Sequence, residues 1–554
     1  MFTRRTPVLL LTLFAFAATA PPARGEDLFS DDLDTGVREA YAETGRVFPT
    51  AVLPRSRDSL HRLLEDLHPA PGSKSSAERA AEALDYRDGE LRLLIDLDLQ
   101  PEAYLEANRE DLSFLESLER EEPLLRFNTA YGVDGGPQLV TQTVLQREYD
   151  VELPTNIPLP AEGNPAPFEN NFIYTGYLYV PGEYLSTTFG RQQIHFGPSS
   201  RSSLMASDRL PYLDAARVSL TLGRLRMTHL VSTIENTASD AELDAGMPEV
   251  LADKAWGHDN QYAYGKNIIF YNVHYFEYAW DRLRLGIGGQ MLISRPMNHF
   301  QLGDFFPVFS WHNADIVPNN MCLVADASYA AAPGLEVYTQ VGLDDVSAET
   351  FGIADSELPT IPAYIAGMRY RRETDGPALS ALLEGGYTHY LWGNFHEEFL
   401  LSRAIYRQNT DAGSESMPLT SPYGPGTLWG LVETSAGWGA RSGPGAARGP
   451  GAERRPGAAP GPDAARGPTF DLGLSYLIRV ENTRANLYST PYRASGRVEN
   501  APRRVLHRVA LRPVYRPVAT MGIYAEPALL VDDGELGFEA TLGFAWRFSR
   551  VSRP

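Results

Sequence analysis

Residues 535–548 read ELGFEATLGFAWRF, and this stretch near the C-terminus decides the fold class. Apolar side chains occupy every second position, namely Leu536, Phe538, Ala540, Leu542, Phe544, Trp546 and Phe548. Because successive side chains of a β-strand point to opposite faces, one face of this strand is apolar and aromatic, and the other carries Gly, Glu, Thr and Arg. The pattern predicts the closing strand of a membrane-spanning β-barrel, although six residues follow Phe548 where the familiar closing strand ends in the aromatic residue itself.

Four stretches earlier in the chain show the same alternation, at 216–222, 283–291, 335–344 and 470–480. A strand with one face toward lipid and the other toward a polar lumen has this pattern. We therefore expect bulky apolar residues such as Leu285, Val337 and Phe544 to point outward.

The strands come in pairs that are joined by short turns and separated by much longer segments. The short turns are Pro181-Gly182, Gly223-Arg224, Trp280-Asp281 and Pro333-Gly334, and the long segments cover roughly 198–215, 237–265, 294–318 and 346–359. Short periplasmic turns and long external loops are typical of outer-membrane barrels. The predicted fold is an all-β transmembrane barrel of about 16 to 18 antiparallel strands over residues 123–549. Successive strands end on alternate sides of the membrane, so a periplasmic N-terminus requires one further strand before Asn170.

A soluble protein is the alternative fold class. A soluble chain of 554 residues would form several domains, and β-sandwiches also contain strands of period two. After the first 25 residues, however, no run of about 18 apolar residues could form a transmembrane helix. The apolar strand faces rich in Leu, Phe and Tyr, the alternating turn lengths and the closing strand favour a barrel.

The N-terminal part has a different composition. Arg4 and Arg5 precede an apolar run from Val8 to Ala20 and a small-residue stretch that ends at Gly25, which predicts a signal peptide over residues 1–25. Residues 26–122 are predicted to form a helical segment. Because its helices are short and acidic, we expect this segment to lie at the periplasmic mouth of the barrel.

Three helices are expected in this segment. The first carries Leu60, Leu63, Leu64 and Leu67 at helical spacing, with Ser56 as its N-cap. The second covers 76–84. The third follows Pro101, a residue suited to the first helical turn, and carries Leu105, Leu112, Leu115 and Leu118.

Composition argues against several kinds of partner and site. The net charge of −21 disfavours nucleic acid as a partner. The single cysteine, Cys322, excludes an intramolecular disulfide and a cysteine-rich metal site, and we expect it to be a packed strand thiol. No metal or cofactor is predicted. Residues 440–468 repeat Gly, Pro, Ala and Arg and are predicted to be a disordered loop of the barrel, because strands resume on both sides; the alternative is a linker between two soluble domains.

Residues 189–212 read FGRQQIHFGPSSRSSLMASDRLPY, a strand that breaks at Gly197-Pro198 into a polar loop. This stretch resembles the corresponding stretch of the capsule assembly Wzi family. The likeness lies in Gly-Arg-Gln, a following His, Gly-Pro, a Ser-Leu pair and an Asp. Two further stretches support the resemblance: 285–303, which runs on to Trp311, His312 and Asn320, and 335–345, which ends in TQVGLDD. A fourth, weaker one is 384–390 followed by 403–423. In this order the likeness covers most of residues 40–435.

The resemblance implies an outer-membrane barrel of a Gram-negative bacterium, whose N-terminal helices close the periplasmic end and which binds capsular polysaccharide at the cell surface. The partners it implies are outer-membrane lipid, surface polysaccharide and the barrel-assembly machinery. The residues that it assigns to polysaccharide binding are Arg191, Gln192, His195, Arg201, Ser203, Asp208, Trp311, His312, Asn320 and Asp345. We expect the stretch from Arg191 to Asp208 to be the core of the functional surface; a structural pairing of Arg191 with Asp208 is the alternative.

Aromatic and charged side chains leave two interpretations open. Tyr212, Trp311, Tyr406 and Tyr423 have the chemistry to stack on sugar rings, but aromatic residues near strand ends also form the girdles of a barrel. Arg508, Arg512 and Arg516, spaced by four on one strand, would either guide an anionic glycan or, as we prefer, pair with lumen acids such as Glu526 and Glu539.

An enzyme is the least favoured interpretation. The sets considered are His195 with Ser203 and Asp208, His312 with Asp315, and His389 with Glu384, and none has a nucleophile motif such as G-x-S-x-G. The sequence thus predicts a polysaccharide-binding barrel. A porin-like or glycan-selective channel is the alternative, and a surface lipid or glycan hydrolase is less favoured.

Overall fold

The structure is a computed structural model. It describes residues 33–67, 76–106, 121–147, 154–158, 168–169, 173–207, 209–239, 241–242, 267–296, 301, 319–345, 359–372, 377–394, 402–410, 413–439, 468–488, 500–518 and 520–553. The predicted signal peptide lies outside these residues.

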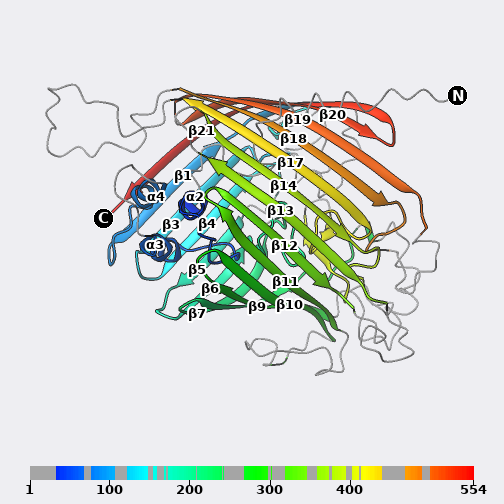
Figure 1. Ribbon diagram of the computed structural model, residues 1–554, viewed down its shortest axis with the longest axis horizontal. Helices are drawn as coiled ribbons and strands as arrows, with labels where there is room; N and C mark the ends of the chain where they lie inside the picture. The colour runs from blue at the N-terminus through cyan, green and yellow to red at the C-terminus, as the bar shows by residue number, and fades with distance from the viewer. Residues whose placement is uncertain are drawn as a thin grey trace.

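Eighteen antiparallel strands form one closed barrel, as predicted (Figure 1). Strand β1 pairs with both β3 and the last strand, β21, so the sheet has no free edge. The short strand β2 continues along β21 after β1. The small hairpin of β15 and β16 is a separate sheet. The strands are β1 (Leu91–Leu99), β2 (Glu102–Glu106), β3 (Leu125–Val133), β4 (Gln138–Leu145), β5 (Ile173–Val180), β6 (Leu185–Gln192), β7 (Leu213–Leu222), β8 (Leu225–Ile234), β9 (Asn267–Ala279), β10 (Leu283–Pro296), β11 (Asn319–Ala332), β12 (Leu335–Leu343), β13 (Pro362–Arg372), β14 (Ala378–Thr388), β15 (Ile405–Asn409), β16 (Ser414–Pro418), β17 (Thr427–Gly439), β18 (Thr469–Asn482), β19 (Arg503–Val518), β20 (Met521–Asp532) and β21 (Glu535–Ser552).

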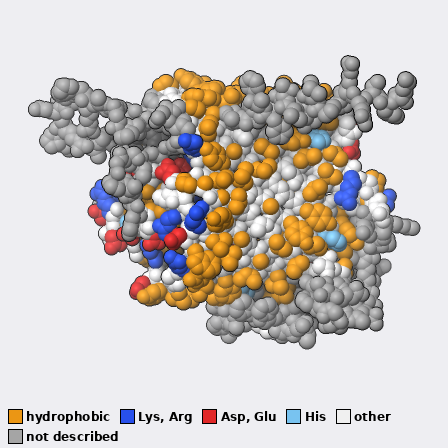
Figure 2. All heavy atoms as spheres, viewed as in Figure 1, with side chains coloured by type: hydrophobic (Ala, Val, Ile, Leu, Met, Phe, Trp, Pro, Cys, Tyr) orange, Lys and Arg blue, Asp and Glu red, His pale blue; other side chains and the backbone are white. Residues whose placement is uncertain are grey.

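Side chains alternate between the outer wall and the lumen, as the period of two predicts. Leu285 and Val337 are 43% and 37% exposed on the outside, whereas Arg284, one position from Leu285, is 1% exposed in the lumen. Hydrophobic side chains cover much of the barrel wall (Figure 2). The following aromatic residues, each at least 38% exposed, lie at one end of the wall: Tyr131, Tyr184, Tyr278, Trp280, Tyr329, Trp438, Phe470 and Tyr515. Such a girdle is typical of the membrane interface of a barrel.

The two ends of the barrel differ. We call the end with the turns at 134–137, 181–184, 223–224, 280–282 and 333–334 the short-turn end, and the opposite end the long-loop end. The aromatic girdle lies at the short-turn end, and so do Gly439 and Thr469, the strand residues on either side of the Gly/Pro/Ala/Arg run; residues 440–467 of this predicted loop lie outside the described residues. The further strand that the alternation of ends requires before Asn170 is β1, and it places residues 33–84 at the short-turn end.

The predicted boundary at residue 123 between helical segment and barrel is therefore wrong. The barrel begins at Leu91, and the helix expected after Pro101 is instead strand β2 at Glu102–Glu106. Apolar residues occupy every second position from Leu91 to Leu99, and of the residues between them only Leu94 is not polar, which is the signal of a strand. Most of the region expected to form the third helix, 107–120, lies outside the described residues.

Helices α2 (Leu33–Glu43), α3 (Arg57–Glu65) and α4 (Ser76–Leu84) pack into a small bundle, and α3 and α4 confirm two predicted helices. The Ser56 hydroxyl accepts the Ser59 N–H at 3.2 Å and caps α3, as predicted. Val37, Tyr41, Leu60 and Leu84 are among the buried residues that form the bundle core. Among the described residues, no helix is long and apolar enough to cross a membrane.

Candidate functional site

The segment that follows β6 turns into the barrel. We call residues 193–207 the lumen loop. Phe196, Leu204 and Met205 are all fully buried, in one core cluster with lumen-facing strand residues such as Tyr271 and Trp429. The Phe196 N–H donates to the Ala206 carbonyl at 3.1 Å, so the loop folds back on itself. The predicted core of a functional surface is therefore a structure that fills the lumen.

Two carboxylates on the barrel wall hold this loop. The Arg201 guanidinium donates to Glu433 on β17 at 2.5 Å from Nη2 and 3.2 Å from Nε. Glu384 on β14 accepts the backbone N–H groups of Ser200 and Arg201 at 2.6 and 3.0 Å. Because these charges are buried, removing one partner would leave the other uncompensated, and the contacts therefore fix the position of the loop.

Three other predicted site residues are buried in or beside the lumen loop. The Ser203 hydroxyl donates to the Phe196 carbonyl at 2.5 Å, and the His195 ring lies 3.1 Å from the Gly197 carbonyl. The Gln192 amide donates to the carbonyl of Ala215 at 3.3 Å. All three side chains are 3% exposed or less. None of them presents an accessible surface to a polymer.

Arg191 differs from its neighbours because it points to the outer wall. Its register partner is Asp214, and the guanidinium donates to that carboxylate from Nε at 2.9 Å and from Nη2 at 3.0 Å. The guanidinium also lies 3.7 Å from the centre of the Tyr212 ring. Arg191 and Asp214 remain 24% and 52% exposed at the long-loop end. The alternative pairing of Arg191 with Asp208 is not tested, because Asp208 lies outside the described residues.

The remaining predicted site residues are scattered. Asn320 on β11 donates to the Asn394 carbonyl at 2.9 Å. It also lines a cavity with room for about one water molecule, beside the buried thiol of Cys322 and the carboxyl group of Asp344. Asp345 follows β12 and accepts the Ile361 N–H through its carbonyl at 2.9 Å. Trp311 and His312 lie outside the described residues.

The aromatic residues that we expected to stack on sugar have different environments. Tyr406 is 3% exposed and belongs to the lumen core, so it is not available for stacking. One face of Tyr212 is covered by Arg191. Tyr423 is half-buried, with its ring centre 4.8 Å from that of Trp429.

A second segment enters the lumen from the short-turn end. We call residues 46–56 the entry segment. The N–H of Leu53 donates to the His195 carbonyl at 3.0 Å, and the His195 N–H donates back to Leu53 at 3.4 Å. The Arg217 guanidinium on β7 donates to the carbonyls of Leu53 and Pro54, both at 2.9 Å. The lumen loop and the entry segment therefore meet inside the barrel.

Glu277 on β9 anchors the entry segment to the wall. Its carboxylate accepts the Ala51 N–H at 2.6 Å and the Thr50 hydroxyl at 2.8 Å. The Arg284 guanidinium lies 3.0 Å from Glu277 and 2.8 Å from Asp326, and these three side chains are at most 1% exposed. A buried network with its groups paired in this way specifies one position for the segment.

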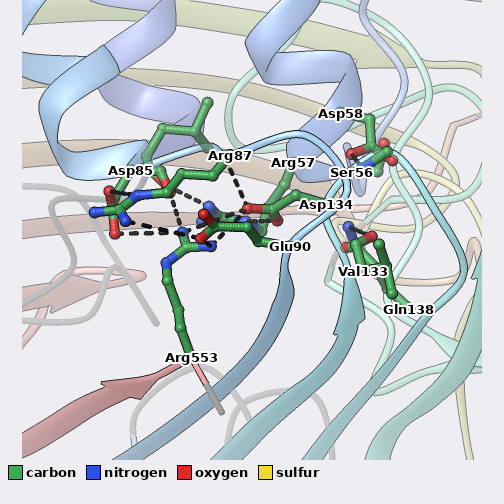
Figure 3. Close-up of polar contacts among 12 residues, drawn as sticks. Ser56, Arg57, Asp58, Asp85, Arg87, Glu90, Val133, Asp134, Gln138 and Arg553 are labelled. Atoms are coloured by element: carbon green, nitrogen blue, oxygen red, sulfur yellow. Dashed lines mark hydrogen bonds and ion pairs between the residues drawn. The ribbon is translucent and has the colours of Figure 1, made fainter.

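The helical bundle is tied to the mouth of the barrel by a second charged network (Figure 3). Asp134, in the turn between β3 and β4, accepts from Arg57 of α3 at 3.4 Å and from the Arg87 N–H at 3.0 Å. Arg553, beyond the end of β21, lies 3.4 Å from Asp134 and 3.1 Å from Glu90. The C-terminus thus holds both the helices and the turn.

The arginines on β19 are paired with acids, as we preferred. Arg508 lies 2.9 Å from Glu526 and 3.3 Å from Glu539, and Arg512 lies 3.8 Å from Glu526. Arg516 pairs with Asp471 on β18. This wall of the lumen is therefore lined by ion pairs.

The described residues give no support for catalysis. The contacts of Ser203 and His195 are to backbone carbonyls and do not join the two side chains. Glu384 accepts a backbone N–H of the lumen loop. The ring of His389 packs against that of Tyr390, with 4.3 Å between the ring centres. No group of three or more described His, Cys, Asp or Glu side chains is placed to hold a metal ion.

No protein-family model matches the sequence, and no curated protein matches it. Among solved structures the chain is similar to Wzi of Escherichia coli, described as an outer membrane protein involved in group 1 capsule assembly and a carbohydrate binding β-barrel. The similarity covers 93% of this chain and 98% of Wzi, with a TM-score of 0.54 and 13% sequence identity. The similarity to OccK1 of Pseudomonas aeruginosa covers 83% of this chain and 99% of OccK1, with a TM-score of 0.39 and 9% sequence identity. At these identities the likeness to Wzi shows the fold, which is that of an outer-membrane β-barrel.

Proposed function

We propose that the chain binds a polysaccharide at the cell surface and aids its attachment or assembly there. In this proposal the long-loop end faces the outside and residues 33–84 lie in the periplasm, where the helices close the barrel mouth. The likeness of the fold to Wzi, which is described as a carbohydrate binding β-barrel, supports the proposal. It also agrees with the sequence resemblance to the Wzi family.

The observation that carries the proposal is the filled lumen. The lumen loop enters from one end and the entry segment from the other, and Leu53 and His195 join them. Side chains such as Phe196, Leu204 and Trp392 pack the space between the walls. An open channel needs a continuous aqueous path, whereas a binding protein needs a rigid surface. A packed lumen supports a rigid surface and leaves little room for an aqueous path.

The predicted site residues take two roles in this proposal. Gln192, His195, Arg201 and Ser203 hold the lumen loop and support the surface from below. Arg191 has an exposed guanidinium at the rim, and Asn320 and Asp345 lie near the long-loop end; these three, with Asp208, Trp311 and His312, are proposed contacts for the glycan.

A porin-like or glycan-selective channel is the second candidate. The partly exposed ion pairs of β19, such as Arg508 with Glu526 at 26% and 27% exposed, favour it because water reaches this wall. Planar-bilayer conductance of the purified full chain separates the two functions. The binding proposal expects little or no conductance, and steady conductance of porin size would contradict it.

Binding itself is tested with a glycan array and the purified protein in detergent. The expected result is retention of a restricted set of surface polysaccharides that shares a repeat unit. A second outer-membrane barrel in the same detergent is the control for non-specific adsorption. Absence of binding to every surface polysaccharide presented, including the glycan of the source cell, would remove the proposed function.

A further inference from the structure

A glycine turn at the long-loop end brings two tyrosines to one place. Residues 421–427 read SPYGPGT and lead from β16 into β17. Tyr423 lies in this turn, and Tyr390 follows the end of β14. The Tyr390 Cα lies 3.5 Å from the position that a Cβ on Gly426 would occupy. We call Tyr390, Tyr423, His389 and Arg484 the tyrosine shelf.

The backbone of this turn is fixed from both sides. The Gly426 N–H donates to the His389 carbonyl at 3.1 Å, and the Gly426 carbonyl accepts the Asn482 N–H at 3.0 Å. The Thr388 hydroxyl donates to the Gly424 carbonyl at 2.6 Å. Gly424 and Gly426 have φ angles of +70° and +69°, which glycine adopts without strain. The turn is therefore rigid before any ligand arrives, and rigidity lowers the entropic cost of binding.

Each tyrosine is supported on the lumen side. The centres of the Tyr423 and Trp429 rings are 4.8 Å apart at 39°, and Trp429 is 3% exposed. The centres of the Tyr390 and His389 rings are 4.3 Å apart at 32°. Tyr390 and Tyr423 pack against the lumen core but remain only half-buried. Both therefore keep exposed aromatic surface at the end of the barrel where the lumen loop and the long loops lie.

The loop after β18 packs against the same turn, because the Ala485 Cβ lies 2.7 Å from the position that a Cβ on Gly426 would occupy. The loop after β18 holds Arg484, which is exposed, and Asn486, which is half-buried. Backbone contacts fix this loop, since the Arg484 N–H donates to the Asn482 side chain at 3.0 Å. Aromatic faces with guanidinium and amide groups at their edge have the chemistry to bind a pyranose ring, whose C–H face is apolar and whose rim carries hydroxyl groups.

We propose that the tyrosine shelf is a subsite for one pyranose unit of the surface polysaccharide, with Tyr390 and Tyr423 as the stacking residues and Arg484 as a donor to its oxygens. The proposal rests on the polysaccharide-binding function proposed above, and it places a subsite outside the 191–208 stretch. The rigid glycine turn that follows Tyr423 is held against the backbone of His389 and Tyr390.

The test uses the full-length protein and a polysaccharide that it retains on the array. Tyr390→Ala and Tyr423→Ala are each expected to raise the dissociation constant roughly three- to tenfold, the range of a lost aromatic contact. Tyr390→Phe and Tyr423→Phe should keep most of the affinity. The matched control is Tyr364→Ala, because Tyr364 is 47% exposed on the outer wall, where its ring stacks on Tyr387.

The outcomes separate the two proposals. If the parent protein binds no polysaccharide, the proposed function fails. If the parent binds and both alanine variants bind equally well, the shelf is overturned while the function stands. The alanine variants could also bind poorly because they are less stable, which a fall of several degrees in unfolding temperature relative to Tyr364→Ala would reveal. In that case the phenylalanine variants decide between the two explanations. If these folded proteins lose affinity although both rings are kept, stacking is also overturned.

Discussion

Leu53 and His195 are paired as if they were neighbours in a β-sheet, although one belongs to a segment that enters from the short-turn end and the other to a loop that enters from the opposite end. Their backbones exchange two hydrogen bonds, at 3.0 and 3.4 Å. Continuous protein therefore connects the two mouths of the barrel through its interior. Changes that loosen either segment should affect both ends.

Replacement of Glu277 tests the anchor of the entry segment. Glu277→Ala leaves Arg284 with one carboxylate and removes the acceptor of Thr50 and Ala51. Breaking a buried pair of this kind costs about 3 to 5 kcal/mol. We expect a clear fall in the temperature at which the folded barrel loses its altered mobility in gel electrophoresis. Glu535→Ala, at an exposed position of β21, is the control, and an equal fall in both variants would contradict the role of Glu277.

The lumen loop depends on glycine at position 197. Gly197 has a φ of +102°, and a Cβ there would lie 1.7 Å from the Gln340 amide nitrogen. Gly197→Ala should displace the loop from the barrel core and raise bilayer conductance above that of the parent. Gly223→Ala is the control, because this glycine also has positive φ, +59°, but no atom lies within 4 Å of its Cβ position. Unchanged conductance in a folded Gly197→Ala protein would show that the loop does not close the lumen.

Arg553 should control the attachment of the helical bundle. Arg553→Ala removes its contacts with Glu90 and Asp134, which are worth about 1 to 2 kcal/mol together. In the purified protein, limited proteolysis should then cut the helical bundle faster, while the barrel remains folded. Arg550→Ala, at an exposed position of β21 shortly before Arg553, should be cleaved at the parental rate. Equal rates in all three proteins would refute the attachment.

Acid should weaken the contact between α2 and the entry segment. Burial alone would raise the pKa of Asp34, but Arg55 and Arg38 outweigh it and hold this pKa below the ordinary value of 3.8. The ion pair therefore stabilises the fold above about pH 4, and this contribution disappears as the pH falls through the lowered pKa. Pepsin digestion between pH 4 and pH 2 should release the helices over this range. In Asp34→Asn the rate of release should depend less on pH; identical profiles would exclude Asp34 as the cause.

The position of the Gly/Pro/Ala/Arg run can be tested on cells. Its two ends, Gly439 and Thr469, pair at the short-turn end. If that end is periplasmic, an epitope inserted after Gly449 should be detected only after the outer membrane is permeabilised. An epitope inserted after Gln301, beyond the long-loop end of β10, should be detected on intact cells. The reverse result would invert the proposed orientation.

The fold was predictable wherever an apolar face is exposed to lipid, because period-two alternation survives there in the sequence. Strand β1 has the same signal over 91–99, but Leu94 interrupts it and helices precede it, so the local pattern also suits a helical segment. The Arg508 pairing was also predictable from spacing, since acids on neighbouring strands face the same lumen. The outward direction of Arg191 follows from strand parity in the same way, once β6 is placed.

The burial of the lumen loop was not predictable from local sequence. GPSSRSS is polar and reads as an exposed loop, and the groups that compensate its burial, Glu384 and Glu433, are contributed by strands far along the chain. The tyrosine shelf was not predicted for a related reason. Its parts come from three separate segments, and local sequence does not show that these segments meet.

The closure of the sheet by β1 and β21 also sets an order of events during biogenesis. Residues 46–56 precede every strand of the barrel in the chain, but they lie inside a ring that closes only when β1 pairs with β21. They must either be enclosed as the first and last strands join or be threaded into a finished barrel afterwards. Arg553, which follows β21, contacts Glu90 and Asp134 and so joins the network that holds helices preceding every strand in the chain. The helical bundle therefore cannot complete this network until β21 has been synthesised.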